Sequence, residues 1–296
     1  MAVVAITAAE RAAFKRCRRA WDLGARLRRG LEPVGTAMEA EDPVRQALAV
    51  HYFPGMWAWD RTIVRPLVVQ SAGDAAGYVE RYVDWAAALD DFEPVRVEFD
   101  FDARIPDPVG DRDLTAPDGR AVHYQGRVNA LVVDNERAHW LLVHRFGPWT
   151  EPAELQLDEE AIAAAWAWEA TFLDARVHGV LYNELTPEGR FRRTRLRLSP
   201  GAIAHAGAQL AVEAAEMLDP SLALYPTPGP YCPACPFLEP CAAMQDGIDV
   251  EALLLRNYRP RPPEELEEGR LGGVTWGMGR GAMPAFREHG SRSPPD

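Results

Sequence analysis

The sequence lacks a long apolar run, an excess of basic residues and a recognisable secretory leader. No stretch of about 18 consecutive apolar residues occurs, so the chain is not expected to cross a membrane. The 296 residues carry 32 Lys and Arg against 44 Asp and Glu, a net charge of −12, which excludes a protein that coats nucleic acid with a uniformly basic surface. Any DNA contact therefore needs a local basic groove. Residues 1–7 are too short and too uncharged for a signal sequence, so we expect a cytoplasmic protein.

Cysteine is also scarce, and three of the four cysteines lie in one short stretch. Cys232, Cys235 and Cys241 are spaced C-x2-C-x5-C, whereas Cys17 lies far upstream. Four thiolates complete the coordination of a tetrahedral zinc ion or of a [4Fe–4S] cluster. Unrelated structural thiols and disulfides are alternatives, although thiols in the cytoplasm usually stay reduced. Zinc is the stronger alternative, but compact zinc sites more often use two C-x2-C pairs.

This cysteine arrangement resembles the iron–sulfur clamp of RecB-like and AddB-like nucleases and of the CRISPR-associated adaptation exonucleases. All of these belong to the PD-(D/E)XK nuclease superfamily, and the resemblance covers roughly residues 7 to 250. It implies a [4Fe–4S] cluster held by Cys17, Cys232, Cys235 and Cys241. Such a site would tie the two ends of the domain together.

The first predicted helix is rich in basic residues. Thr7 and Glu10 form a capping box, and the helix is expected to continue to about Arg29 with Cys17 inside it. The range 11–29 contains eight basic residues and one acid. These arginines form either an ordinary solvated helix surface or a face that contacts phosphates beside the cysteines.

Three more helices are expected before the first strand. One begins at Asp42-Pro43 and ends at Pro54-Gly55, because proline is favoured in a first helical turn. The others are expected over residues 56–69 and 74–89. The second of the three contains Trp57 and Trp59, which we interpret as core residues rather than as a platform for stacking bases.

The remainder of the chain predicts an α/β fold. Strict alternation of apolar and polar residues predicts a strand over 95–105. Further elements are expected in this order: strands 122–133 and 139–146, a helix 158–173, strands 177–185 and 190–198, and a helix 199–219. This order resembles the PD-(D/E)XK nuclease-like core, a mixed central sheet flanked by helices, with an N-terminal helical region and a C-terminal cysteine loop. The predicted domain spans 1–258, and the Pro-, Gly- and Glu-rich range 259–296 predicts a disordered tail.

The catalytic motifs of the superfamily are degenerate in this sequence. The motif histidine corresponds to His51, and the motif G-x-x-D reads Gly126-Arg-Val-Asn129. The motif D/E-x-K reads Val143-His-Arg145, and the motif Q-x-x-x-Y reads Glu160-Ala-Ile-Ala-Ala164. The resemblance thus gives His51, Asn129 and Arg145 as the positions of a catalytic site.

These exchanges predict weak or absent hydrolysis. Phosphodiester cleavage requires Mg²⁺ or Mn²⁺ held by carboxylates. Asn129 offers a neutral oxygen, Val143 offers none, and Arg145 keeps its proton near neutral pH. A displaced carboxylate is the alternative, with three candidates: Glu98, Asp100 and Asp134.

Three functional hypotheses follow. The first is a DNA exonuclease with a relocated carboxylate, and the second is a relative that binds DNA or a partner protein with little hydrolysis. The third is a zinc-stapled protein-interaction module. For DNA contact, the strand 190–198 contributes three alternating arginines: Arg193, Arg195 and Arg197.

Overall fold

The computed structural model describes residues 3–35, 42–172, 175–261, 270–271 and 274–275. The chain divides into two units, Met1–Pro263 and Glu264–Asp296. In the second unit, the described residues are the antiparallel pair β9 (Arg270–Leu271) and β10 (Val274–Thr275). Most of the predicted tail 259–296 therefore lies outside the described residues.

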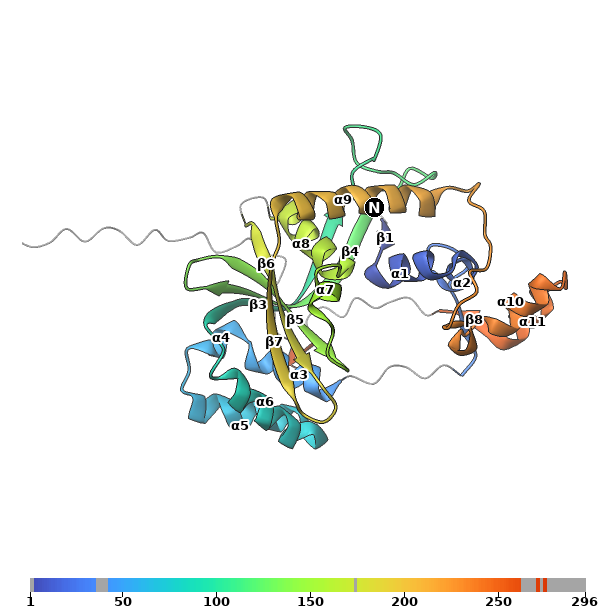
Figure 1. Cartoon of the computed structure of the whole chain (residues 1–296). Helices are drawn as coiled ribbons and strands as arrows, with labels where there is room; N and C mark the ends of the chain where they lie inside the picture. The colour runs from blue at the N-terminus through green and yellow to red at the C-terminus, as the bar shows by residue number, and fades with distance from the viewer. Residues whose placement is uncertain (1–2, 36–41, 173–174, 262–269, 272–273, 276–296) are drawn as a thin grey trace, which may run out of the picture. The chain divides into compact units, whose positions relative to one another are not determined.

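The first unit is built on one mixed sheet, as the sequence predicted (Figure 1). Its six strands are β1 (Val4–Ile6), β3 (Phe92–Arg104), β4 (Val122–Asp134), β5 (His139–Phe146), β6 (Val177–Leu185) and β7 (Phe191–Arg197). The β1–β4 and β5–β6 pairs are parallel, and the β3–β4, β4–β5 and β6–β7 pairs are antiparallel. The long strand β4 pairs with β1 near its start and with β5 near its end. The α/β class with a mixed central sheet is thereby confirmed.

Helices cover both faces of this sheet. One face packs against α8 (Glu159–Thr171) and α9 (Pro200–Leu218), and the other packs against a helical group (Figure 1). That group consists of α3 (Pro43–His51), α4 (Pro54–Trp57), α5 (Arg61–Ser71) and α6 (Ala76–Ala86). The short helix α7 (Pro152–Leu155) precedes α8. Within the described ranges, no helix is long and apolar enough to cross a bilayer.

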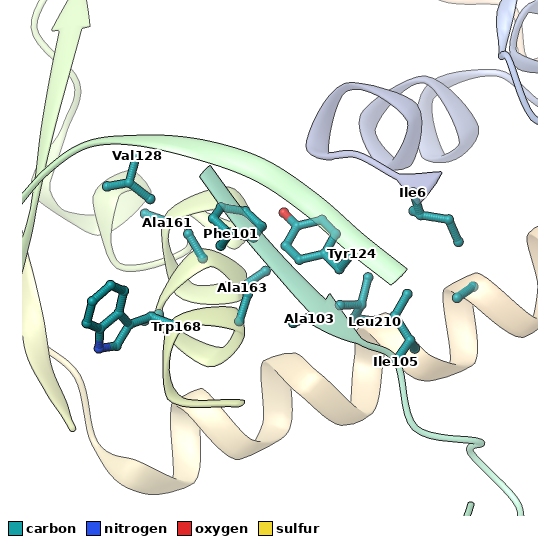
Figure 2. Packing of buried hydrophobic residues seen from close by; sticks show 14 of the residues in the cluster. Ile6, Phe101, Ala103, Ile105, Tyr124, Val128, Ala161, Ala163, Trp168 and Leu210 are labelled. Carbon is teal, nitrogen blue, oxygen red and sulfur yellow. The ribbon is translucent and has the colours of Figure 1, made fainter. Parts of the chain in front are cut away.

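The larger core lies between the sheet and α8. Phe101, Tyr124 and Val128 point from β3 and β4 toward the alanine-rich face of α8 (Figure 2). Small side chains let α8 approach the sheet closely, and Trp168 fills the space at its far end. The helices α8 and α9 are close enough that a methyl group on Gly207 would overlap the indole of Trp166.

The predicted single helix from Thr7 to Arg29 is wrong. The structure has α1 (Ala8–Arg16) and α2 (Arg18–Gly24), separated by Cys17 in an extended conformation with φ −163° and ψ 109°. The predicted cap is correct, since the Thr7 hydroxyl accepts the Glu10 amide at 3.2 Å. The break has a tertiary cause, because the Cys17 sulfur accepts the Thr227 amide at 3.4 Å.

The predicted helix 56–69 is also wrong, because two helices replace it. The Asp60 carboxylate accepts the Thr62 amide at 2.8 Å and caps α5, so α4 ends at Trp57. In β3 the strict alternation begins only at Phe99, since the pairing with β4 shifts between Pro94 and Arg96. Val95, expected in the core, is 44% exposed.

Three short strands of the first unit were not predicted from the sequence. The strand β1 lies beside β4, and β2 (Leu31–Pro33) pairs with β8 (Tyr258–Pro260). The β2–β8 pair places residues 258–260 in the first unit, whereas the sequence analysis put the boundary after residue 258.

Candidate cysteine cluster and degenerate catalytic site

Three of the four cysteines lie near one tyrosine, Tyr231, and the fourth lies near Arg19 of α2. Cys17 lies at the α1–α2 junction, Cys232 begins the 3-10 turn Cys232–Ala234, Cys235 directly follows that turn, and Cys241 lies on α10 (Leu238–Gln245). Tyr231 links the two regions, because its hydroxyl oxygen lies 2.7 Å from the carbonyl oxygen of Arg16 and 2.6 Å from that of Thr227, and its single proton can be donated to either one. The pKa of Tyr231 is raised by desolvation and then by the nearby sulfurs of Cys17, Cys232 and Cys235. The Tyr231 hydroxyl group is therefore close enough to three of the four thiols for their charge to raise its pKa.

The fourth thiol is reached by an arginine. Arg19 Nη1 lies 3.3 Å from the carbonyl oxygen of Cys241 and 3.8 Å from its sulfur. A second sulfur accepts a backbone amide, since the Gly229 nitrogen lies 3.3 Å from Cys232 Sγ. Amide donors of this kind stabilise thiolates and tune the potential of metal–sulfur clusters.

The four thiols therefore fit a four-thiolate centre in chemical type. All four cysteines are free thiols. Among the described residues, no three Cys, His, Asp or Glu side chains yet stand close enough together to hold a metal ion. The segment after the cysteines is nevertheless fixed against α2, because Phe237 packs on Leu23 and stacks on Tyr258 at 5.4 Å.

The predicted catalytic histidine lies in a buried polar network. His51 Nε2 is 3.4 Å from Asp90 Oδ2, and both side chains are 1% exposed. Arg193 of β7 approaches the other oxygen of Asp90 at 2.8 Å. The structure thus brings together His51, expected in catalysis, and Arg193, expected on DNA. The sequence analysis missed Asp90, which joins them.

Neutral polar groups complete this network. The hydroxyls of Tyr52 and Tyr82 lie 2.8 Å apart, and Asn183 donates to Tyr82 at 2.6 Å. Burial raises the pKa of both tyrosines, so they stay protonated. The His144 ring stacks on Tyr52, and burial, followed by the charges of Arg193 and His51, lowers the pKa of His144 to about 3. His144 therefore faces the core that contains Tyr52, on the opposite side of the sheet from Val143.

Asn129, predicted from the resemblance to be a catalytic position, is bonded to a carboxylate of the neighbouring strand β3. Its Nδ2 donates to Glu98 Oε1 at 2.9 Å, and its Oδ1 accepts the His144 amide at 2.9 Å. Glu98 has φ +43°, a left-handed conformation that is unusual for a residue other than glycine. The second oxygen of Glu98 is 2.7 Å from Arg45 Nη2. The Arg45 guanidinium therefore neutralises Glu98, the candidate relocated carboxylate that is bonded to Asn129.

The third family position faces α8. Arg145 Nη1 donates to Asp158 Oδ2 at 2.7 Å, while Asp158 Oδ1 caps α8 through the Ala161 amide. Val143 packs against the larger core. Burial, followed by the charge of Asp158, raises the pKa of Glu160. The three predicted catalytic residues therefore belong to three different polar groups.

The other two candidate carboxylates have structural partners. Asp134 accepts the Glu136 and Ala138 amides and the Trp140 indole N–H, each at 2.9 Å, so it closes the β4–β5 turn. Asp100 pairs with Arg127 at 2.7 Å on the exposed face of β3 and β4.

The basic residues near the N-terminus mostly pair with acids of other helices. Arg11 lies 2.7 Å from Glu213, and Arg18 lies 3.1 Å from Glu216, both on α9. Lys15 pairs with Glu159 and Glu213, Arg28 with Asp22, and Arg29 with Glu251. These contacts tie the N-terminal segment to the domain, which neither of our two interpretations of the arginines anticipated.

The three arginines of β7 differ in environment. Arg193 is buried against Asp90, and Arg195 pairs with Asp91 at 2.8 Å over the Trp140 ring. Arg197 is exposed. Two of the three therefore already have internal counter-ions.

Comparisons with known proteins give little information about this chain. No protein-family model and no curated protein matches the chain. A crystal structure titled SSO0001 matches at 16% sequence identity and a TM-score of 0.33, over 70% of this chain and 89% of that one. At this TM-score the similarity implies neither a family nor a function.

Proposed function

We propose that this chain is a DNA-binding, RecB-like member of the PD-(D/E)XK superfamily that carries a [4Fe–4S] cluster and hydrolyses DNA weakly or not at all. The observation that carries the proposal is the gathering of cysteines from both ends of the unit around Tyr231 and Arg19. Cys17, Cys232, Cys235 and Cys241 would hold the cluster, which would act as a staple. A reducing, cytoplasmic location agrees with four free thiols.

The lack of hydrolysis follows from the partners of the family positions. The side-chain nitrogen of Asn129 donates to Glu98 and its side-chain oxygen accepts the His144 backbone amide, while Arg145 is paired with Asp158. His51 is turned into the buried network with Asp90. A hydrolytic Mg²⁺ or Mn²⁺ site needs several anionic oxygens around one point. His51, Asn129 and Arg145 and their partners do not bring several anionic oxygens together around one point.

The test begins with protein purified without oxygen. A broad visible absorbance with about four iron atoms per chain supports the cluster, whereas one zinc atom and no colour supports the zinc-stapled interaction module instead. The same protein is then tested for DNA binding at low salt and for degradation of DNA with Mg²⁺ or Mn²⁺. Binding without degradation is the expected result, and binding to a protein but to no DNA would contradict the proposal.

An active nuclease with a relocated carboxylate is the second candidate, favoured by Glu98. This residue contacts Asn129, its side chain is only 14% exposed, and its backbone is in a strained region that is often found at functional sites. Glu98→Gln would then abolish metal-dependent degradation of DNA, while Asp100→Asn would leave it unchanged. Degradation that survives Glu98→Gln would exclude this candidate.

A further inference from the structure

An exposed tryptophan lies between two arginines where the β5–α7 loop meets the β6–β7 hairpin. Trp149 is 42% exposed, with Arg190 Cζ 4.6 Å and Arg192 Cζ 5.2 Å from its ring centroid. Arg81 of α6 reaches the same hairpin, because a methyl group on Gly189 would lie 2.6 Å from its Nη2. We call Trp149, Arg190, Arg192 and Arg81 the Trp149 platform.

One arginine of the Trp149 platform is structural. Arg192 forms a two-point ion pair with Glu184, at 2.7 Å and 2.9 Å, and that carboxylate is 1% exposed. Glu184 also accepts the Thr150 amide at 2.7 Å, next to Trp149 in the chain. The backbone beside the indole is therefore held in place.

The other two arginines remain open to a ligand. Arg190 approaches Glu188 only to 3.9 Å, with both side chains about two-thirds exposed, so water screens this pair. Arg81 donates to the Gly77 carbonyl and lies 5.8 Å from the Tyr78 ring centroid. In the ion pairs found among the described residues, Arg81 has no carboxylate partner. By contrast, Arg193 and Arg195 are held by aspartates.

We infer that the Trp149 platform is a binding site for single-stranded DNA. An exposed indole offers a face on which any unpaired base can stack, and guanidinium groups bind phosphates through two hydrogen bonds. Arg190 would leave its place over the Trp149 ring, one base would stack on the ring face that it uncovers, and Arg190 and Arg81 would contact the flanking phosphates. This inference rests on the proposed DNA-binding function and gives it a location other than Arg193, Arg195 and Arg197.

Two acidic residues lie at the edge of the Trp149 platform. Glu188 lies beside Arg190, and Glu151 acts electrostatically on Arg192. A phosphate bound by Arg190 would be repelled by Glu188, so Glu188→Gln should tighten DNA binding. A surface that only packs against apolar protein would not respond in this way.

The experiment measures the fluorescence anisotropy of a labelled oligothymidylate of about 15 nucleotides at several salt concentrations. Trp149→Ala should weaken binding about tenfold with an unchanged salt slope, and Trp149→Phe should retain most of the affinity. Arg190→Gln should reduce the slope of log K against log salt by about 0.7, the value for one lost phosphate contact on a single strand. Annealing the oligonucleotide to its complement should weaken binding, because its bases are then stacked.

The matched control is Arg112→Gln, an exposed arginine in the connection between β3 and β4 that should leave affinity and slope unchanged. Wild-type affinity in Trp149→Ala and Arg190→Gln, or tighter binding to the duplex, would overturn the platform while leaving DNA binding intact. Absence of binding by the wild type at low salt would overturn both. Because Arg190 is exposed, its slope decides the question even where Trp149→Ala fails to fold.

Discussion

Removing the charge of Asp90 should strongly destabilise the protein. Asp90 is the carboxylate that joins His51 to Arg193, and its side chain is 1% exposed. Asp90→Asn keeps the size and a hydrogen-bond acceptor but leaves the Arg193 guanidinium buried without a counter-ion. Arg193 is itself 9% exposed and cannot turn to solvent without losing its bonds to the Leu89 carbonyl and Asn183.

The expected cost follows from burial. Breaking one side of a buried ion pair costs about 3–5 kcal/mol, which is a large part of the roughly 5–15 kcal/mol that stabilises a typical domain. The next residue provides the control, because Asp91 pairs with Arg195 at the same distance of 2.8 Å while 55% exposed. Asp91→Asn should cost about 0.2–1 kcal/mol. Urea unfolding of both variants measures the difference, with an expected midpoint shift on the order of 1 M for Asp90→Asn.

A double-mutant cycle separates the pair from its surroundings. Arg193→Met combined with Asp90→Asn should cost less than the sum of the single changes, because neither charge is then left alone. Equal destabilisation by Asp90→Asn and Asp91→Asn would refute the reasoning, since it would mean that burial does not govern this network.

Three further predictions test the other sites. Cys17→Ser should lose iron and visible absorbance and lower the unfolding midpoint, whereas Ala20→Ser in the adjacent helix should keep the metal; iron-replete Cys17→Ser would reject Cys17 as a ligand. The triple change Asn129→Asp, Val143→Glu, Arg145→Lys should raise Mg²⁺-dependent degradation of DNA above that of the wild type, and a triple variant without any gain would show that the site is lost beyond these positions. The pKa of His144 is about 3 in the folded protein, below its ordinary value of 6.5. As the pH falls, the unfolded chain therefore binds a proton at this residue before the folded protein does. The folded state keeps its full stability with respect to His144 above pH 6.5 and loses stability as the pH falls toward 3. His144→Phe should therefore flatten the pH dependence of the unfolding free energy by up to about 1.4 kcal/mol per pH unit in that window, and an unchanged slope would contradict the shift.

The sheet could be predicted from the sequence because its strands carry local signals. Apolar and β-branched runs bounded by turn residues such as Gly147 and Gly189 define β4 to β7 nearly to the residue. Strand β1 carries no such signal, because three apolar residues do not by themselves indicate a strand. They form one by pairing with Val122–Tyr124 of β4. The helix break at Cys17 is equally invisible, because its cause is a contact with Thr227, which is 210 residues away in sequence.

The candidate site was harder to predict because ion pairing depends on the fold. The sequence identifies Arg193, Arg195 and Arg197 as one alternating set, yet Asp90 and Asp91 neutralise two of them. These aspartates follow α6 in a loop that has no periodic pattern. Arginine spacing predicts which side chains share a face of a strand, but not whether that face is already occupied by a counter-ion.

The same reasoning applies to Asn129, which the proposed resemblance aligns with a metal-binding aspartate. The left-handed Glu98 coincides with a change in which alternate residues of β3 face the α8 side: Phe99 and Phe101 do so, whereas Val97 packs with the other core. This change directs the Glu98 carboxylate toward residue 129. An aspartate there would face another carboxylate at hydrogen-bond distance and would require a cation between them. Asparagine donates a hydrogen bond instead, and Arg45 supplies the positive charge from α3. Under the proposed function, Asn129 and Arg45 therefore stabilise the sheet at Glu98 without a metal ion.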